Sequence, residues 1–273
     1  MTRKKESAGG GRESVAVATA LLLVYTMHVG TELVLAQQVG HGRGPVSGHG
    51  AAGHGHGDVG AAEPKWEGSP EGVAYSEFNH RLAAAFVLLI GLSEFRSLLV
   101  ETWLVWARFL LPLALLGSGG FLLIWSDHDA WPIGSIGFAE TFTGNDPEII
   151  QHKLYGVLLL SVGAVEVARR KGRLPQAVWR LPLPLFALFG GAMLFGHMHG
   201  AHPGAQKIAT HHTVMGLFAV TAGACKLIAG WVDQPAVGSA RRGADVMRKS
   251  FRWELAWATL VLVIGVQLLM YSE

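Results

Sequence analysis

The sequence predicts an all-α protein, a polytopic membrane helical bundle, on three observations. Half of the residues are hydrophobic and only 15% are charged. The apolar residues fall in long runs, most of them close to the roughly 20 residues that a helix needs to cross the hydrocarbon core of a bilayer. These runs also lack the alternation of barrel strands, so helices are the structure that satisfies the backbone in lipid.

Six apolar runs follow one another and predict six core transmembrane helices: Phe78–Phe95, Phe109–Trp125, Ile149–Ala168, Leu181–Phe195, Thr213–Trp231 and Trp253–Tyr271. The N-terminus and every second connection between these runs are basic. The basic connections contain Arg96 and Arg108, Arg169–Arg173, and Arg241–Arg252. The other connections are acidic or carry histidine. By the positive-inside rule the basic connections are cytoplasmic, which places the histidine-bearing ones in the periplasm of a bacterial inner membrane. Tryptophans near the ends of the runs are expected at the membrane interfaces: Trp103, Trp106, Trp125, Trp131, Trp179, Trp231 and Trp253.

Residues 1–36 are predicted to be a signal peptide or an N-terminal membrane anchor. A basic start precedes the short apolar stretch Val15–Tyr25, and Val34-Leu35-Ala36 has the character of a signal-peptidase site. The alternative is a retained seventh helix. Both interpretations place the next segment outside.

Residues 37–76 form a predicted Gly/His-rich periplasmic arm, and residues 77–273 the six-helix transmembrane domain. The arm lacks an apolar period and cannot bury enough surface to fold alone. His41, His49, His54 and His56 recur among its glycines. The arm is either a linker with incidental histidines or a weak metal-collecting segment, because short His-rich tracts recur in metal binding.

The core contains a degenerate repeat headed by His80, His152 and His212. A glycine follows each histidine after eleven residues and a charged residue after fourteen: Gly91 and Glu94, Gly163 and Glu166, Gly223 and Lys226. The pattern predicts three helical hairpins, over about 78–130, 149–203 and 210–273, and membrane proteins built from repeats often place sites between them. The three charged residues are interpreted as interfacial groups that reach the headgroups, with an ion or proton path as the alternative.

The candidate site is a group of His and Met residues on the predicted outer side, where all thirteen histidines fall. Met193 and His197 share a helix face, as do His211 and Met215. Thioether sulfur selects Cu(I) and imidazole also suits copper, so this mixture without paired cysteines predicts copper as Cu(I) or Cu(II). The candidate ligands are His80, His152, Met193, His197, Met198, His199, His202, His211, His212 and Met215.

Acidic residues near these histidines have two possible roles. Asp127 and Asp129 are candidates for fixing imidazole tautomers from outside the ligand shell. The triplet Asp146-Pro147-Glu148 is instead interpreted as a helix start, with acids at the positive end of the dipole. Cys225 lies in an apolar run and is interpreted as a packing residue.

With these residues in view, the chain resembles the copper-resistance D family of bacterial inner-membrane proteins. The likeness rests on Ile150-Gln151-His152-Lys153-Leu154-Tyr155-Gly156 before an apolar helix that ends in Arg169-Arg170-Lys171-Gly172-Arg173, and on His197-Met198-His199. The resemblance implies copper binding, transport or resistance at the periplasmic face, through His152, His197, His199, His211 and His212. A periplasmic copper carrier is an expected partner besides the lipid bilayer, and the alternative is that the His-rich arm takes the place of a separate carrier.

The alternative function is a membrane cytochrome with haem b that passes electrons from quinol to a periplasmic acceptor. Glu77-Phe78-Asn79-His80-Arg81 looks like the helix start of haem A synthases, and His80, His152 and His212 would ligate the haem. No Cys-x-x-Cys-His attachment exists, so such a haem would be non-covalent. A structural or assembly subunit is the third possibility. The chain has no ATPase motif, nucleophile elbow or nucleic-acid patch, so a catalytic role is not the expectation.

Overall fold

The computed structural model describes residues 69–99, 105–197, 204–232 and 240–272. Within these ranges every regular element is helical, which confirms the all-α class. The predicted signal peptide or anchor, and the predicted arm up to residue 68, lie outside the described residues.

Six helices make up most of the described chain: α2 (Pro70–Leu99), α3 (Leu110–Ile124), α5 (Pro147–Arg170), α6 (Pro182–Met193), α7 (Ala205–Val232) and α8 (Ala240–Leu269). Shorter elements flank them: η2 (Val105–Phe109), α4 (Phe138–Thr143), η3 (Ala177–Arg180) and η4 (Leu194–Gly196). Five segments in the described part of the chain are long and apolar enough to cross a membrane: Trp106–Ile124, Pro147–Arg170, Ala177–Gly196, Ala205–Val232 and Ser250–Leu269. Helix α2 is not among these five segments.

Two helix starts are explained by their caps. Helix α2 begins at Pro70 rather than near Phe78, because the Ser69 hydroxyl accepts a hydrogen bond from the backbone N–H of Gly72 at 3.0 Å and proline suits the first helical position. The predicted boundary between arm and helical domain therefore falls inside this helix. Asp146 caps α5 by accepting from the N–H groups of Glu148 and Ile149, at 3.0 and 3.2 Å, which confirms the predicted helix start.

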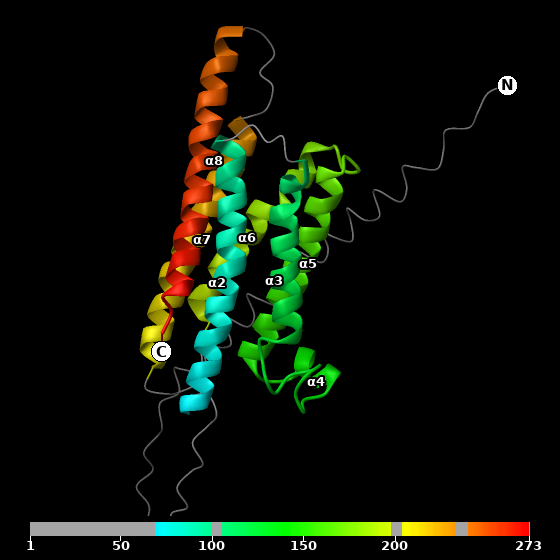
Figure 1. Ribbon diagram of the computed structural model, residues 1–273, viewed down its shortest axis with the longest axis vertical. Coiled ribbons are helices and arrows are strands. Elements are labelled where there is room, and N and C mark those ends of the chain that lie inside the picture. The colour runs from blue at the N-terminus through cyan, green and yellow to red at the C-terminus, as the bar shows by residue number, and fades with distance from the viewer. Residues whose placement is uncertain (1–68, 100–104, 198–203, 233–239, 273) are drawn as a thin grey trace, which may run out of the picture.

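The six long helices pack in a ring in the order α2, α3, α5, α6, α7 and α8, and α8 closes the ring against α2. Figure 1 shows α3 beside α5, and α2 beside α8. The closest packing joins α3 to α5, α6 to α7, α7 to α8 and α8 to α2. The first two predicted hairpins are therefore not the tightest units, because α3 and α6 each pack more extensively on the helix that follows than on the helix that precedes.

Glycine explains this preference at two of the contacts. A methyl group added to Gly119 of α3 would lie 2.8 Å from the carbonyl oxygen of Gly156 in α5. One added to Gly191 of α6 would lie 2.9 Å from the carbonyl oxygen of Gly216 in α7. Small residues let backbones approach in this way in membranes, where van der Waals packing holds helices together.

Apolar side chains fill the middle of the ring and also cover its outside. Leu111, Leu115, Val162 and Trp257 belong to the central buried cluster, as does Cys225, in agreement with its predicted packing role. Large apolar side chains along the helices are exposed, among them Leu92, Leu113, Phe189, Leu217 and Val266. Apolar surface of this extent suits contact with lipid. Of the predicted interfacial tryptophans, Trp179 is buried and Trp103 lies outside the described residues. The other five are exposed: Trp106, Trp125, Trp131, Trp231 and Trp253.

Polar residues gather at the two ends of the ring. The end that carries α4 and Tyr271, lower in Figure 1, holds the histidines and is called the histidine end. The opposite end holds Glu94, Glu166 and Lys226 and is called the charged end. Helix α8 extends beyond its neighbours there.

Candidate functional site

Four histidines from four different parts of the chain form a row of rings at the histidine end. The ring centroids of His152 and His197 are 5.1 Å apart, those of His197 and His212 are 4.7 Å apart, and those of His212 and His80 are 5.8 Å apart. His152 belongs to α5, His197 follows η4, His212 belongs to α7 and His80 belongs to α2. His197 and His212 are almost fully buried, 3% and 2% exposed. The four are called the imidazole row below.

Three of the four rings are oriented by an acceptor at Nδ1. His152 donates to Asp127 Oδ1 at 2.7 Å, His197 to Gln151 Oε1 at 2.6 Å, and His80 to the Ser76 carbonyl at 2.8 Å. Carboxylate and carbonyl oxygens only accept, so Nδ1 carries the hydrogen and the lone pair of each neutral ring lies on Nε2. A hydrogen bond of this kind from the second nitrogen is the arrangement found behind metal-ligating histidines.

Asp127, in the loop after α3, holds two consecutive residues of α5. Its second oxygen accepts from Lys153 Nζ at 3.0 Å and from the Ser126 hydroxyl. Burial would raise the pKa of Asp127, but the interactions with His152, Lys153 and Ser126 lower it to about 2. The carboxylate is therefore ionised at neutral pH and keeps its acceptor role.

Lys153 also joins α5 to the end of α3. Its side chain is fully buried, and Nζ lies 3.1 Å from the carbonyl oxygen of Leu123, one of the last residues of α3. The last carbonyls of a helix have no partner within it and carry partial negative charge. An ammonium group there satisfies one of them and also fixes the position of Asp127.

Tyr271 closes the row at its other end. Its ring stacks on His80 with centroids 3.8 Å apart and an interplanar angle of 15°. It also lies near His211 and His212, with centroids 5.7 and 6.3 Å away, and it is only 1% exposed. The segment after α8 therefore packs directly on histidines from α2 and α7.

The spacing of the rings can be compared with that of imidazoles on one metal ion. Such an ion lies roughly 2.0 Å from the nitrogen and so about 3 Å from the ring centre. Two ring centres are then about 5 Å apart where the N–metal–N angle is bent and about 6 Å apart where it is linear. The three observed spacings of 4.7, 5.1 and 5.8 Å span these values. Among the residues that the structure describes, however, no three His, Cys, Asp or Glu side chains group closely enough to hold one ion. Two neighbouring rings of the row therefore have the spacing of two ligands on one ion, but three rings do not converge on one point.

The predicted ligands divide into three groups. His80, His152, His197 and His212 form the row, and His211 adjoins it through Tyr271. Met193 and Met215 are buried, one turn along the chain from His197 and His212. Met198, His199 and His202 lie outside the described residues.

Sequence reasoning missed Gln151, Lys153 and Tyr271 as parts of this site. Gln151 and Lys153 flank His152 and are completely buried, although one is polar and the other charged. Polar residues at consecutive positions near the start of an apolar helix were the available signal, because burying such groups costs free energy unless they are paired. Nothing in the sequence singled out Tyr271.

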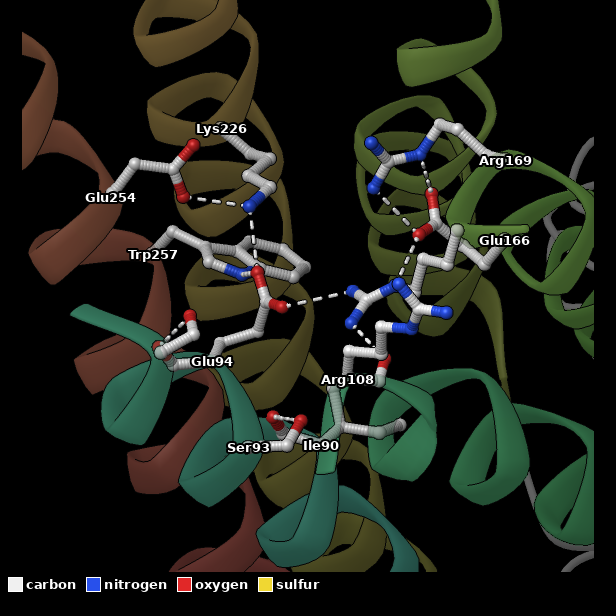
Figure 2. Close-up of polar contacts among 11 residues, drawn as sticks. Ile90, Ser93, Glu94, Arg108, Glu166, Arg169, Lys226, Glu254 and Trp257 are labelled. Carbon is white, nitrogen blue, oxygen red and sulfur yellow. Dashed lines mark hydrogen bonds and ion pairs between the residues drawn. The ribbon is translucent and has the colours of Figure 1, made fainter. Parts of the chain in front are cut away.

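The charged end holds an ion-pair network that corrects the predicted interfacial role of its residues (Figure 2). Glu94 of α2 accepts from Lys226 of α7 at 2.7 Å and from Arg170 of α5 at 3.3 Å. Lys226 also donates to Glu254 of α8 at 2.6 Å, and Trp257 Nε1 donates to Glu94 at 3.3 Å. Glu94 is only 7% exposed, so it pairs inside the bundle instead of reaching toward headgroups.

The same network continues along α5. Glu166, 2% exposed, accepts two hydrogen bonds from Arg169, at 3.0 and 2.8 Å, and one from Arg170 at 3.1 Å. Arg170 also donates to the carbonyl oxygen of Arg108, before α3. Side chains from α2, α5, α7 and α8 are thereby linked, and the opposite charges offset the cost of burying each one.

Comparison with known proteins gives no match: no protein-family model, curated protein or solved structure is similar to the chain. The resemblance to the copper-resistance D family therefore rests on the quoted motifs alone. Of these, His152 and His197 have adjacent rings.

Proposed function

We propose that this protein is a multi-pass protein of a bacterial inner membrane that handles copper at its periplasmic side. Helix α2 would be the sixth span, beside the five apolar segments, and residues 1–36 a signal peptide or anchor. The basic residues near the charged end support a cytoplasmic position for that end and a periplasmic one for the histidine end.

One observation supports copper above the other candidates. Three imidazoles of the row are held by acceptors on Nδ1, so the lone pair of each neutral ring is on Nε2, and the centroids of adjacent rings have the spacing of two ligands on one ion. Burying polar groups in an apolar region costs free energy unless they are hydrogen-bonded, and ionisable residues at membrane depth usually mark a functional site.

The row suits Cu(I) in particular. Cu(I) accepts low coordination numbers, so a pair of imidazoles suffices where no group of three converges. The buried thioethers of Met193 and Met215, each about one helical turn along the chain from His197 or His212, would add soft ligands that favour Cu(I) over harder cations. Met198, His199, His202 and His211 would receive the ion first, from the His-rich arm or from a periplasmic carrier.

The test is Cu(I) affinity, measured on the purified protein by competition with a chromophoric chelator. The double variant His197→Ala/His212→Ala should lose the tight site, because it removes the most buried pair of the row. His128→Ala is the matched control, since His128 is partly exposed and pairs with Asp129. Equal affinities for the double variant and the wild type would refute the proposal.

Haem b is the second candidate, and one spacing favours it. The rings of His80 and His212, 5.8 Å apart, approach the roughly 6 Å expected of two imidazoles on opposite sides of an iron. The pairs His152–His197 and His197–His212 are closer than this and do not fit that arrangement. A stoichiometric Soret band in protein purified under haem-replete expression, lost in His80→Ala, would favour an electron-transfer role over copper handling.

A further inference from the structure

The imidazole row contains more ligand atoms than one two-coordinate ion uses. A neutral imidazole has a lone pair on only one of its ring nitrogens, so each ring can bind a single ion. Four rings therefore provide four ligand nitrogens. Among the residues that the structure describes, no three candidate ligands group around one point, so an ion in the row takes two nitrogens. Two nitrogens remain for a second ion.

Only one division of the row gives every ring a neighbouring partner. It pairs His152 with His197, whose ring centroids are 5.1 Å apart, and His212 with His80, at 5.8 Å. Both spacings lie within the about 5–6 Å expected for two imidazoles on one ion. The remaining spacing of 4.7 Å, between His197 and His212, separates the two pairs. These two positions are called the terminal pairs.

Each terminal pair joins a partly exposed ring to a buried one. The His152 side chain is 16% exposed, and His80 is also partly exposed. His197 and His212, in the middle of the row, are 3% and 2% exposed. An ion can therefore reach or leave each terminal pair at its exposed ring, without passing through the other pair.

Two Cu(I) ions in the terminal pairs would repel each other. The central spacing of 4.7 Å, extended by half of each terminal spacing, places the ions no more than about 10 Å apart. At an effective dielectric constant of about 20, unit charges at this distance lower the affinity for the second ion at least roughly ten-fold. The carboxylate of Asp127 does not offset this repulsion, because Lys153 balances its charge.

We propose that the imidazole row binds two Cu(I) ions, one in each terminal pair, and that their repulsion promotes release. This inference rests on the proposed copper function and adds the number of ions and the cause of their release. One tightly held ion leaves slowly. Two adjacent positions let an arriving ion displace the one already present, as neighbouring ions do in a channel.

The first test counts the Cu(I) ions that the purified full chain retains against a chromophoric chelator. His152→Ala and His80→Ala should each retain one ion fewer than the wild type. The double variant His152→Ala/His80→Ala should also retain only one fewer, because His197 and His212 then form a pair with each other. The matched control is His128→Ala, at the same end but outside the row, which should retain the wild-type number.

The second test measures how fast the chelator removes Cu(I) from the wild type. Protein loaded until the row is full should release its first ion roughly ten-fold faster than protein loaded with one equivalent, because repulsion acts only when both pairs are occupied. His152→Ala should show the slow rate alone. Thermal unfolding without copper checks that each variant folds. Since His152 and His80 lie on different helices, either single variant is sufficient for the count.

Three results would overturn the proposal. Wild-type numbers of ions in both single variants would mean that the row holds one ion. Loss of two ions in the double variant would mean that each exposed ring binds copper without its neighbour. Equal release rates at low and full loading would exclude repulsion as the cause of release. Undiminished binding in His197→Ala/His212→Ala would instead refute the copper function itself, so the two failures are distinguishable.

Discussion

Asp127 Oδ1 accepts a hydrogen bond from His152 Nδ1 at 2.7 Å and so joins the loop after α3 to the second turn of α5. The neighbouring Lys153 binds the other oxygen of the same carboxylate at 3.0 Å. One buried carboxylate thus sets the orientation of the first ring of the imidazole row and the position of the helix that carries it.

Removing this carboxylate should weaken copper binding. Asp127→Ala is expected to lower Cu(I) affinity about 10- to 100-fold, the usual effect of losing a partner behind a metal-ligating histidine. Asp127→Asn should have a smaller effect, because its amide oxygen still accepts from His152. Asp129→Ala, in the same loop but exposed and paired with His128, should match the wild type in the chelator competition. Identical affinities for Asp127→Ala and Asp129→Ala would show that Asp127 does not orient a ligand.

Gln151 should matter for stability as well as for His197. Gln151→Leu keeps a side chain of similar size but leaves Nδ1–H of the buried His197 without its acceptor, at a cost of about 1–3 kcal/mol. Thermal unfolding in detergent would measure the loss. Gln206→Leu is the control, because Gln206 is an exposed glutamine near the start of α7. An unchanged melting temperature in Gln151→Leu would contradict the assigned hydrogen bond.

The network at the charged end should be sensitive to the loss of a single member (Figure 2). Glu94→Ala leaves the three cations of the network with two carboxylates, Glu166 and Glu254, and so with one buried positive charge in excess, which should destabilise the protein by up to about 3–5 kcal/mol. Glu77→Ala removes an exposed pair with Arg81 and should cost at most about 1 kcal/mol.

Adding Lys226→Met to Glu94→Ala should recover part of the loss, since it removes the excess positive charge from the network. Thermal unfolding of the wild type, the two single variants and the double variant forms a double-mutant cycle. Strict additivity of the two substitutions would mean that Glu94 and Lys226 do not interact.

Adjacent glycines of α3 provide a test of helix packing. Gly119→Ala places a methyl group 2.8 Å from backbone atoms of α5 and should force the helices apart, at a cost of about 1–3 kcal/mol. A methyl group at Gly120 meets nothing within 4 Å, so Gly120→Ala should be neutral or stabilise by up to about 1 kcal/mol through helix propensity. Chemical denaturation would compare them, and equal stabilities would contradict the close contact between α3 and α5.

The proposed orientation can be tested with single cysteines introduced into a Cys225→Ser background. Asp129→Cys should react with a membrane-impermeant thiol reagent in intact cells, whereas Arg173→Cys should react after lysis only. Both positions are exposed and lie at opposite ends of the bundle, so accessibility to solvent is matched. The reverse labelling pattern would invert the topology.

The sequence determined the helical class and several local features, because these depend on residues that are close together in the chain. Runs of apolar residues predicted helices at the positions of α3, α5, α6 and α7, and Asp146-Pro147 predicted the start of α5. The histidine group was recognised as a candidate site by composition and spacing. The start of α2 was misplaced, since the cap at Ser69 lies in a segment whose composition is typical of a linker.

Only the tertiary structure decided which side chains meet. Glu94, Glu166 and Lys226 occupy repeat-equivalent positions in the sequence, yet pairing across four helices, and not their distance from a helix end, determines their environment. The order of rings from His152 through His197 and His212 to His80, with Tyr271 at its end, likewise requires four helices to be placed around one another. Hydrophobic periodicity specifies which residues a helix buries but not which neighbouring helix covers them. In this bundle the close glycine contacts determine that α3 packs on α5 and that α6 packs on α7.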